Sequence, residues 1–205
     1  MPAKAEGVSV TGDWDPLGMR ATVSRTLLLK DVFVPEDEML MPHGVYFRAA
    51  STFPHMFLTL SPTYMGLAQA AYDFTVAYLR GEVPGTPPVK RRMFPTKQIA
   101  VAEMHVMLEQ TKALWFQAIS EARADPSRDQ VRRAYAAQHT VMENANALAA
   151  KAIRTCGGQA MLKSLPLERI YRDSRCGSLM LPWTAEICLD RLGRETLYKP
   201  GEKDD

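Results

Sequence analysis

Cysteine is scarce in this 205-residue chain. The three cysteines, Cys156, Cys176 and Cys188, form neither a Cys-x-x-Cys pair nor a cluster with histidine. The first residues lack the apolar core of a secretory signal, and an odd number of cysteines without such a signal is typical of reduced thiols in the cytoplasm. We therefore expect a cytoplasmic protein in which all three cysteines are packing residues.

Long apolar runs and a strong net charge are also missing. No window approaches the ~20 apolar residues that a membrane-spanning helix needs. The formal net charge is +2, from 25 basic and 23 acidic residues, so the sequence does not suggest the basic surface of a nucleic-acid-binding protein. The hydrophobic content of 46% is enough for one good core. We expect a protein that neither spans a membrane nor binds nucleic acid.

Several motifs of metal and nucleotide sites are absent. The four histidines fall on different predicted elements, and the Glu-x-x-His spacing of di-iron helical bundles does not occur. No Gly-x-Gly-x-x-Gly or Walker-type loop exists, which argues against a nucleotide-binding α/β domain. We therefore predict no metal site.

The first part of the chain, residues 1–42, has the pattern of β-structure. Apolar and polar residues alternate over 7–11, and residues 25–34 are rich in β-branched and apolar side chains up to Pro35. Two or three strands do not form a stable sheet alone. They need further strands from a missing segment or a partner, so we predict a partial β-domain over 1–42.

From about residue 49 the apolar period changes from two to 3.6, which predicts helices. Pro54 and Pro62 should break or kink the first turns. The predicted helices after the proline-rich loop 81–95 cover residues 96–123, then from the Asp125-Pro-Ser signal to 156, then 166–173 and 183–195. Long helices joined by short loops favour a mainly α fold, an antiparallel four-helix bundle over 43–200 with a tail over 201–205.

Three local features allow both a structural and a functional interpretation. Gly157-Gly158 is typical of a helix C-cap but could contact a ligand. The run 90–92, Lys-Arg-Arg, is typical of a solvated loop but could bind a phosphate. In the charged segment 167–173, i,i+4 spacing predicts a structural ion pair between Arg169 and Asp173.

Five segments in order resemble the C-terminal half of the acyl-CoA dehydrogenase superfamily. The first joins Trp14-Asp-Pro-Leu-Gly-Met-Arg-Ala-Thr-Val-Ser24 to Leu29-Lys-Asp-Val-Phe-Val-Pro35, at the end of the family's middle β-domain. The others are Arg91-Arg-Met-Phe-Pro95, Cys156-Gly-Gly158, Leu165-Pro-Leu-Glu-Arg-Ile-Tyr-Arg-Asp-Ser-Arg175 and Thr184-Ala-Glu-Ile187, which is similar to the family's EGTSEI box. The specificity lies in the order and spacing of the segments across nearly the whole chain.

The resemblance implies a homo-oligomer, a dimer or tetramer, and a bound flavin, FAD with FMN as an alternative. The flavin would lie between the β-domain and the bundle and would contact the bundle of a neighbouring subunit. Carried over by position, the cofactor-binding residues would be Arg91, Phe94, Gly157, Gly158, Thr184, Ala185 and Glu186. Pro95 stands where the family has a glycine after the phenylalanine. The resemblance also implies that the chain is a fragment lacking the N-terminal domain.

The activity implied by the resemblance is FAD-dependent oxidation of a CH–CH bond in an acyl-CoA or a related small molecule. This reaction needs a carboxylate as general base, but Pro182 occupies the family's glutamate position. A second base position used by some members falls near His55-Met56, again without a carboxylate. The weak substitutes are Glu186 and His55. Two alternatives follow: a flavin-dependent monooxygenase of the same fold, which needs no such base, or a non-catalytic helical oligomerisation module.

Overall fold

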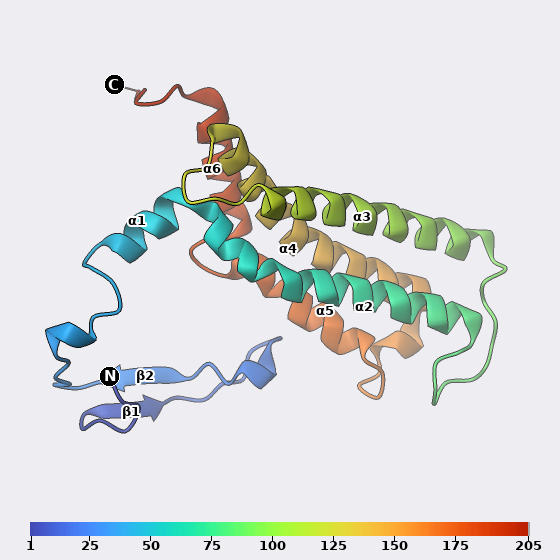
Figure 1. Cartoon of the computed structure of the whole chain (residues 1–205). Coiled ribbons are helices and arrows are strands. Elements are labelled where there is room, and N and C mark those ends of the chain that lie inside the picture. The colour runs from blue at the N-terminus through green and yellow to red at the C-terminus, as the bar shows by residue number, and fades with distance from the viewer. Residues whose placement is uncertain (205) are drawn as a thin grey trace.

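A β-hairpin lies beside a helical bundle in the computed structural model (Figure 1). The structure describes residues 1–204 and their side chains, except those of residues 51 and 52. Strands β1 (Val8–Thr11) and β2 (Thr26–Leu29) pair antiparallel, with Val8 opposite Leu29. The second strand is shorter than the predicted span 25–34, because the backbone turns at Asp31, whose φ is 51°. The hairpin leaves most of its side chains exposed.

Prolines divide the next segment into three helical pieces, as the sequence predicts. Helix α1 (Val45–Thr52) is followed by the 3₁₀ segment η3 (Pro54–Thr59) and then by α2 (Ser61–Arg80). Pro54 and Pro62 each lie in the first positions of a helical piece. There the missing N–H removes no intrahelical hydrogen bond, and the fixed φ already suits a helix.

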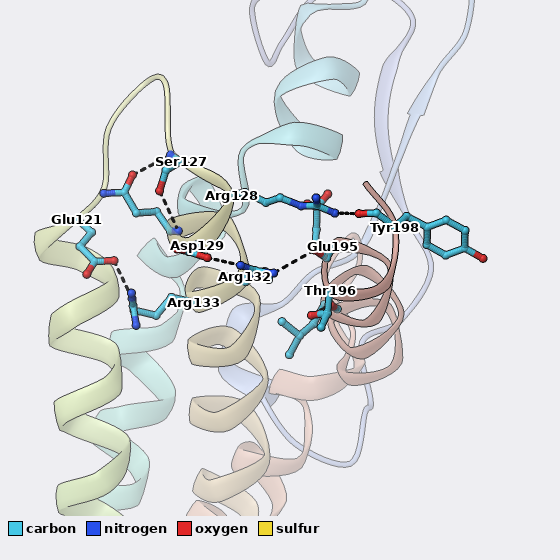
Figure 2. A network of polar contacts seen from close by, with 11 residues as sticks. Glu121, Ser127, Arg128, Asp129, Arg132, Arg133, Glu195, Thr196 and Tyr198 are labelled. Carbon is cyan, nitrogen blue, oxygen red and sulfur yellow. Dashed lines mark hydrogen bonds and ion pairs between the residues drawn. The ribbon is translucent and has the colours of Figure 1, made fainter. Parts of the chain in front are cut away.

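Two long helices follow the proline-rich loop 81–94. Helix α3 (Pro95–Ser120) begins one residue earlier than predicted, with Pro95 in its first turn. Helix α4 (Arg128–Cys156) begins at a capping box, in which Ser127 Oγ accepts the N–H of Gln130 and the Gln130 side chain accepts the N–H of Ser127 (Figure 2). Its C-cap residue is Gly157, whose φ of +89° favours glycine.

The C-terminal part packs across the long helices. Helix α5 (Leu167–Arg175) follows the 3₁₀ turn η4 (Gly158–Met161), and α6 (Ala185–Leu197) follows η5 (Gly177–Leu179). Two short 3₁₀ segments, η1 (Arg20–Thr22) and η2 (Glu36–Glu38), complete the described elements. Helix α4 contacts α2, α3, α5 and α6, so it is the central helix of the bundle.

The core of the bundle lies along α4. Its largest fully buried side chains include Tyr64 and Met104 from the flanking helices and Met142 and Leu148 from α4 itself. Among the described residues, no helix is both long and apolar enough to cross a membrane. The architecture confirms the predicted mainly helical bundle preceded by a short antiparallel β-segment.

Candidate functional site

The charged helix α5 attaches the hairpin to the bundle. The Arg172 guanidinium pairs with the Glu168 carboxylate, Nε to Oε2, at 2.8 Å, and donates a 2.7 Å hydrogen bond from Nη1 to the Leu17 carbonyl. Asp173 Oδ1 accepts the backbone N–H of Met19 at 2.6 Å. The predicted ion pair between Arg169 and Asp173 is therefore wrong: the Asp173 carboxylate faces the hairpin, and the i,i+4 pair is Glu168 with Arg172.

A tight turn carries the chain from α5 to α6. Gly177 is buried against Tyr64 and Met142, and a Cβ placed on it would lie 2.7 Å from the Tyr64 ring. The peptide bond between Leu181 and Pro182 is cis. Thr184 then caps α6, its hydroxyl oxygen accepting the N–H of Ile187 at 3.3 Å. The predicted site residues Thr184, Ala185 and Glu186 thus form the N-terminal end of α6.

Aromatic packing joins Trp183, which follows one of the two expected base positions, to Phe57, which follows the other. Trp183 is 3% exposed, and its ring lies edge-on to Phe57 on η3 at 5.6 Å and to Tyr135 on α4 at 5.0 Å between centroids. Pro182 therefore lies next in sequence to a residue that contacts η3, the segment that carries His55. Neither the 182–183 nor the 55–56 position supplies a carboxylate.

The two candidate substitute bases differ in environment. His55 is 5% exposed, its two ring nitrogens have no hydrogen-bond partner among the described residues, and its ring lies 5.3 Å from that of Phe53. Burial lowers the pKa of His55, and the negative charge of Glu121 opposes that shift without cancelling it. Glu186 is exposed on the first turn of α6. Within residues 1–204, no hydrogen bond or ion pair orients either side chain as a base.

The other predicted cofactor-binding residues gather where α2 and α4 both end. The Arg91 guanidinium carbon lies 4.9 Å from the centroid of the Tyr78 ring. The Tyr78 hydroxyl donates a 2.9 Å hydrogen bond to Gln159, which directly follows Gly157-Gly158. A Cβ placed on either of these glycines would meet no atom within 4 Å. The structure thus brings Arg91 and the glycine pair to one end of the bundle, with open space beside the glycines.

Phe94 lies at the same end but makes no comparable contact. It is the N-cap residue of α3 and is 52% exposed. Pro95, which replaces the glycine of the family pattern, occupies the first turn of α3 and so serves as a helix start. The loop therefore presents Phe94 at the surface beside Arg91.

The two groups of predicted residues are far apart within one chain. Helix α6 packs on the N-terminal half of α4, where Tyr135 contacts Trp183 and Cys188, whereas Gly157 follows the last residue of α4 (Figure 1). The 22 residues from Tyr135 to Gly157 correspond to about 30 Å of helix at 1.5 Å per residue.

Comparison with known proteins decides the family. Residues 58–179 match the family model described as "Acyl-CoA dehydrogenase, C-terminal domain". The putative acyl-CoA dehydrogenase YdbM of Bacillus subtilis (strain 168) is 31% identical over 182 residues, which are 83% of this chain and 45% of YdbM. The chain belongs to the acyl-CoA dehydrogenase family. It spans less than half the length of this curated relative.

Two solved structures are similar to almost the whole of this acyl-CoA dehydrogenase family chain. A nitrososynthase from Micromonospora carbonacea var. africana superposes with a TM-score of 0.79 at 27% identity, covering 96% of this chain and 52% of that one. KijD3, solved with FMN and dTDP-3-amino-2,3,6-trideoxy-4-keto-3-methyl-D-glucose, superposes with a TM-score of 0.80 at 25% identity, covering 98% and 52%.

Two clusters of this acyl-CoA dehydrogenase family chain were missed by the sequence-based reasoning. In the first cluster, Arg175 pairs with Glu143 on α4 at 2.9 Å and also donates a hydrogen bond to Ser178. Burial alone would raise the pKa of Glu143. The hydrogen bonds from Ser178 and Arg175 and the positive charge of Arg175 outweigh burial, so the pKa is lowered. The second cluster is Tyr78 with Gln159. The partners in each cluster are separated by 32 and 81 residues, and no local spacing signals such pairs.

Proposed function

We propose that this chain is the helical part of a flavin-dependent oxidoreductase and that its reaction is oxygen transfer rather than α,β-dehydrogenation. The observation that carries the proposal is the contact between Trp183 and Phe57. Trp183 directly follows one expected base position, Phe57 lies next to the other, and neither position holds a carboxylate. Removal of an α-proton needs a positioned base, whereas oxygenation chemistry is supplied by the flavin itself.

The described residues fit a flavin with a phosphate or diphosphate tail. Arg91 offers a permanently charged, planar set of donors, and the contacts of its guanidinium in the structure are the Tyr78 ring and the Val89 carbonyl. The open backbone at Gly157 and Gly158 permits close approach of a ligand. We assign the flavin tail to this end of the bundle, with FAD as the first candidate and FMN as the second.

The flavin ring belongs at the other end, along Thr184, Ala185 and Glu186. Because about 30 Å of α4 separates the two ends, we infer that one flavin touches α6 of one copy and the Arg91 end of a second copy. A homodimer is thus the smallest assembly that forms a complete site, and a tetramer would hold two such dimers. The bound flavin would accept hydride or transfer oxygen, and the helices would orient it and its substrate.

A second candidate function is acyl-CoA dehydrogenation, favoured by the 31% identity with a putative acyl-CoA dehydrogenase. It would require a substitute base. Glu186 is the better candidate of the two, because it is an exposed carboxylic acid in the first turn of α6, whereas His55 is buried away from solvent.

The test begins with flavin binding. The 205-residue chain and the product of the whole gene are purified, mixed with FAD or FMN, desalted and examined for a visible flavin spectrum. We expect flavin to be retained. If neither protein retains either flavin, the flavoprotein proposal fails and the non-catalytic oligomerisation module takes its place.

The two reactions are then distinguished by whether the substrate reduces the flavin or O₂ reoxidises it. Dehydrogenation bleaches the oxidised flavin when an acyl-CoA such as butyryl-CoA is added without oxygen. Oxygen transfer instead needs chemically reduced flavin, which supplies two electrons and is reoxidised. It consumes O₂, adds one oxygen atom to an acceptor such as an amine or thioether, and releases the other as water. Bleaching by butyryl-CoA that is abolished by Glu186→Gln, but not by Glu202→Gln in the tail, would establish the dehydrogenase and overturn oxygen transfer.

A further inference from the structure

Tyr78 is a buried side chain that lies between the two groups proposed to hold the flavin tail. It is on the last turn of α2 and is 2% exposed. One face of its ring stacks on Phe74, one turn earlier, with centroids 5.9 Å apart and planes 20° from parallel. The Arg91 guanidinium also lies over the Tyr78 ring, and the hydroxyl reaches Gln159.

Arg91 is held by its backbone as well as by this ring. Its N–H donates a 2.8 Å hydrogen bond to the Leu79 carbonyl, so the loop returns to the end of α2 at this residue. The side chain then has Tyr78 on one side, and its Nη1 donates to the Val89 carbonyl at 3.2 Å. When a guanidinium lies over an aromatic ring, its N–H groups still point outward in the guanidinium plane and can donate hydrogen bonds to a ligand.

The charge of Arg91 acts near the glycine pair. Cys156, which directly precedes Gly157, has its pKa raised by burial to about 11, and the positive charges of Lys97 and Arg91 oppose that rise. The Lys97 ammonium is anchored on the carbonyl of Thr155 at 2.5 Å. Two cations therefore border the last turn of α4, and no hydrogen bond or ion pair joins Arg91 to a carboxylate of residues 1–204.

We propose that Tyr78 is a positioning residue for Arg91: its ring fixes the guanidinium beside Gly157 and Gly158, where an anionic phosphate group can accept the free N–H donors. This inference rests on the proposed flavin binding. It goes further by assigning to an uncharged core residue a share of the affinity for the cofactor tail. Without the ring, Arg91 samples many rotamers and must be ordered when the ligand binds.

The competing explanation is that Tyr78 only fills the core, and affinity measurements separate the two. The dissociation constant for FAD is measured by flavin fluorescence for the wild type, Arg91→Ala, Tyr78→Leu, Tyr78→Phe and the double variant Tyr78→Leu/Arg91→Ala. We expect Arg91→Ala to weaken FAD binding about 10- to 100-fold, the range for a hydrogen bond to a charged group. Tyr78→Leu should weaken it about tenfold, because the charge remains but is no longer held.

Two comparisons identify positioning specifically. Tyr78→Phe keeps the aromatic ring but loses the hydrogen bond to Gln159, and its affinity for FAD should stay within about threefold of the wild type. The double variant should bind no more weakly than Arg91→Ala alone, because contacting residues in one network are not additive. Leu148→Ala, a core substitution in the C-terminal half of α4, is the control: it should lower the melting temperature but leaves the Tyr78 ring and Arg91 in the protein.

Each other outcome overturns the inference. If Tyr78→Leu lowers the melting temperature as Leu148→Ala does but leaves the FAD affinity unchanged, Tyr78 is a core residue only. If Arg91→Ala leaves the FAD affinity unchanged, the protein still binds flavin, but the proposed role of Tyr78 in positioning Arg91 is wrong. If the effects of Tyr78→Leu and Arg91→Ala add fully, the two residues act independently. A wild-type protein without affinity for FAD removes both this inference and the proposed function.

Discussion

The backbone N–H of Met19 donates a 2.6 Å hydrogen bond to the carboxylate of Asp173, across 154 residues of sequence. The neighbouring Gly18 packs so closely on α5 that a Cβ placed on it would lie 2.3 Å from the Arg172 carbonyl oxygen. Together with the hydrogen bond from Arg172 to Leu17, these contacts join the hairpin segment to the bundle. The charged helix α5 is therefore a docking element for the β-segment.

Asp173→Ala should loosen this junction. The substitution removes an acceptor that is charged and close to its donor, and hydrogen bonds to charged groups contribute about 1.5–3 kcal/mol. We expect faster proteolysis between residues 12 and 25, followed by mass spectrometry of the fragments, and a fall of about 1–2 kcal/mol in the free energy of unfolding in urea.

The matched control is Asp190→Ala, which removes a carboxylate paired with Arg194 on exposed α6. Exposed ion pairs contribute at most about 1 kcal/mol, and usually less, so proteolysis of the hairpin should not change. Equal cleavage rates in the wild type and Asp173→Ala would show that the hairpin is held by other contacts.

Gly177→Ala should destabilise the turn between α5 and α6. The added methyl would lie 2.6 Å from Met142 Sδ and 2.7 Å from the Tyr64 ring. Met142 can move its flexible end, but the Tyr64 ring is 2% exposed and closely packed. Overpacking of this kind costs about 1–3 kcal/mol, which urea unfolding measures directly.

Gly66→Ala serves as the comparison, because it lies exposed on α2 with open space around it. Alanine is favoured over glycine within a helix by about 1 kcal/mol, so this variant should be unchanged or more stable. Destabilisation of both variants to the same extent would indicate that the space around Gly177 is not the cause.

The order and type of the elements follow closely from the sequence because proline, glycine and the capping residues act locally. Pro54 and Pro62 break the first helical segment where expected, and Ser127 and Gly157 delimit α4. A residue's own neighbours in sequence decide these boundaries. The strand 25–34 was predicted too long, because the left-handed backbone at Asp31 is set by the return of the chain past Gly7, whose carbonyl accepts the N–H of Lys30.

The candidate site was predicted less completely, since its contacts are long-range. The resemblance placed Arg91 and the glycine pair in one site, and both lie at the same end of the bundle. Spacing alone could not show that Tyr78 lies between them or that Asp173 faces Met19 rather than Arg169. The i,i+4 rule allows both Glu168 with Arg172 and Arg169 with Asp173. Only the first pair forms, and the Asp173 carboxylate instead accepts the N–H of Met19.

The ion pair between Glu143 and Arg175 should make stability depend on pH. Because the pKa of Glu143 is lowered in the folded chain, its ionised form stabilises the fold above the ordinary glutamate pKa of about 4.3. That contribution is lost as the pH falls below 4.3 through the lower pKa of the folded state. Both side chains are 36% exposed, so solvent screening limits the effect to about 1 kcal/mol.

Glu143→Gln should accordingly be less stable than the wild type at pH 7 and approach it at pH 3. The measurement is the urea midpoint of both proteins across this range. Glu109→Gln is the control, because its pair with Lys112 is at the surface and the Glu109 side chain is 56% exposed. A difference between Glu143→Gln and the wild type that stays constant down to pH 3 would mean that the amide disturbs packing rather than charge.

Ser127→Ala should weaken the start of α4, and with it the packing of α6. Ser127 supplies one half of the capping box, and the next residue, Arg128, pairs with Glu195 on α6 at 3.1 Å (Figure 2). Loss of an N-cap side chain costs about 0.5–2 kcal/mol. Ser127→Asp retains an acceptor at the cap and adds negative charge at a helix N-terminus, so it should restore the stability. Hydrogen exchange then locates the change. We expect the first-turn amides of α4 to exchange faster in Ser127→Ala and at the wild-type rate in Ser127→Asp. Equal exchange in all three proteins would show that the Arg128–Glu195 pair holds the helix end without the cap.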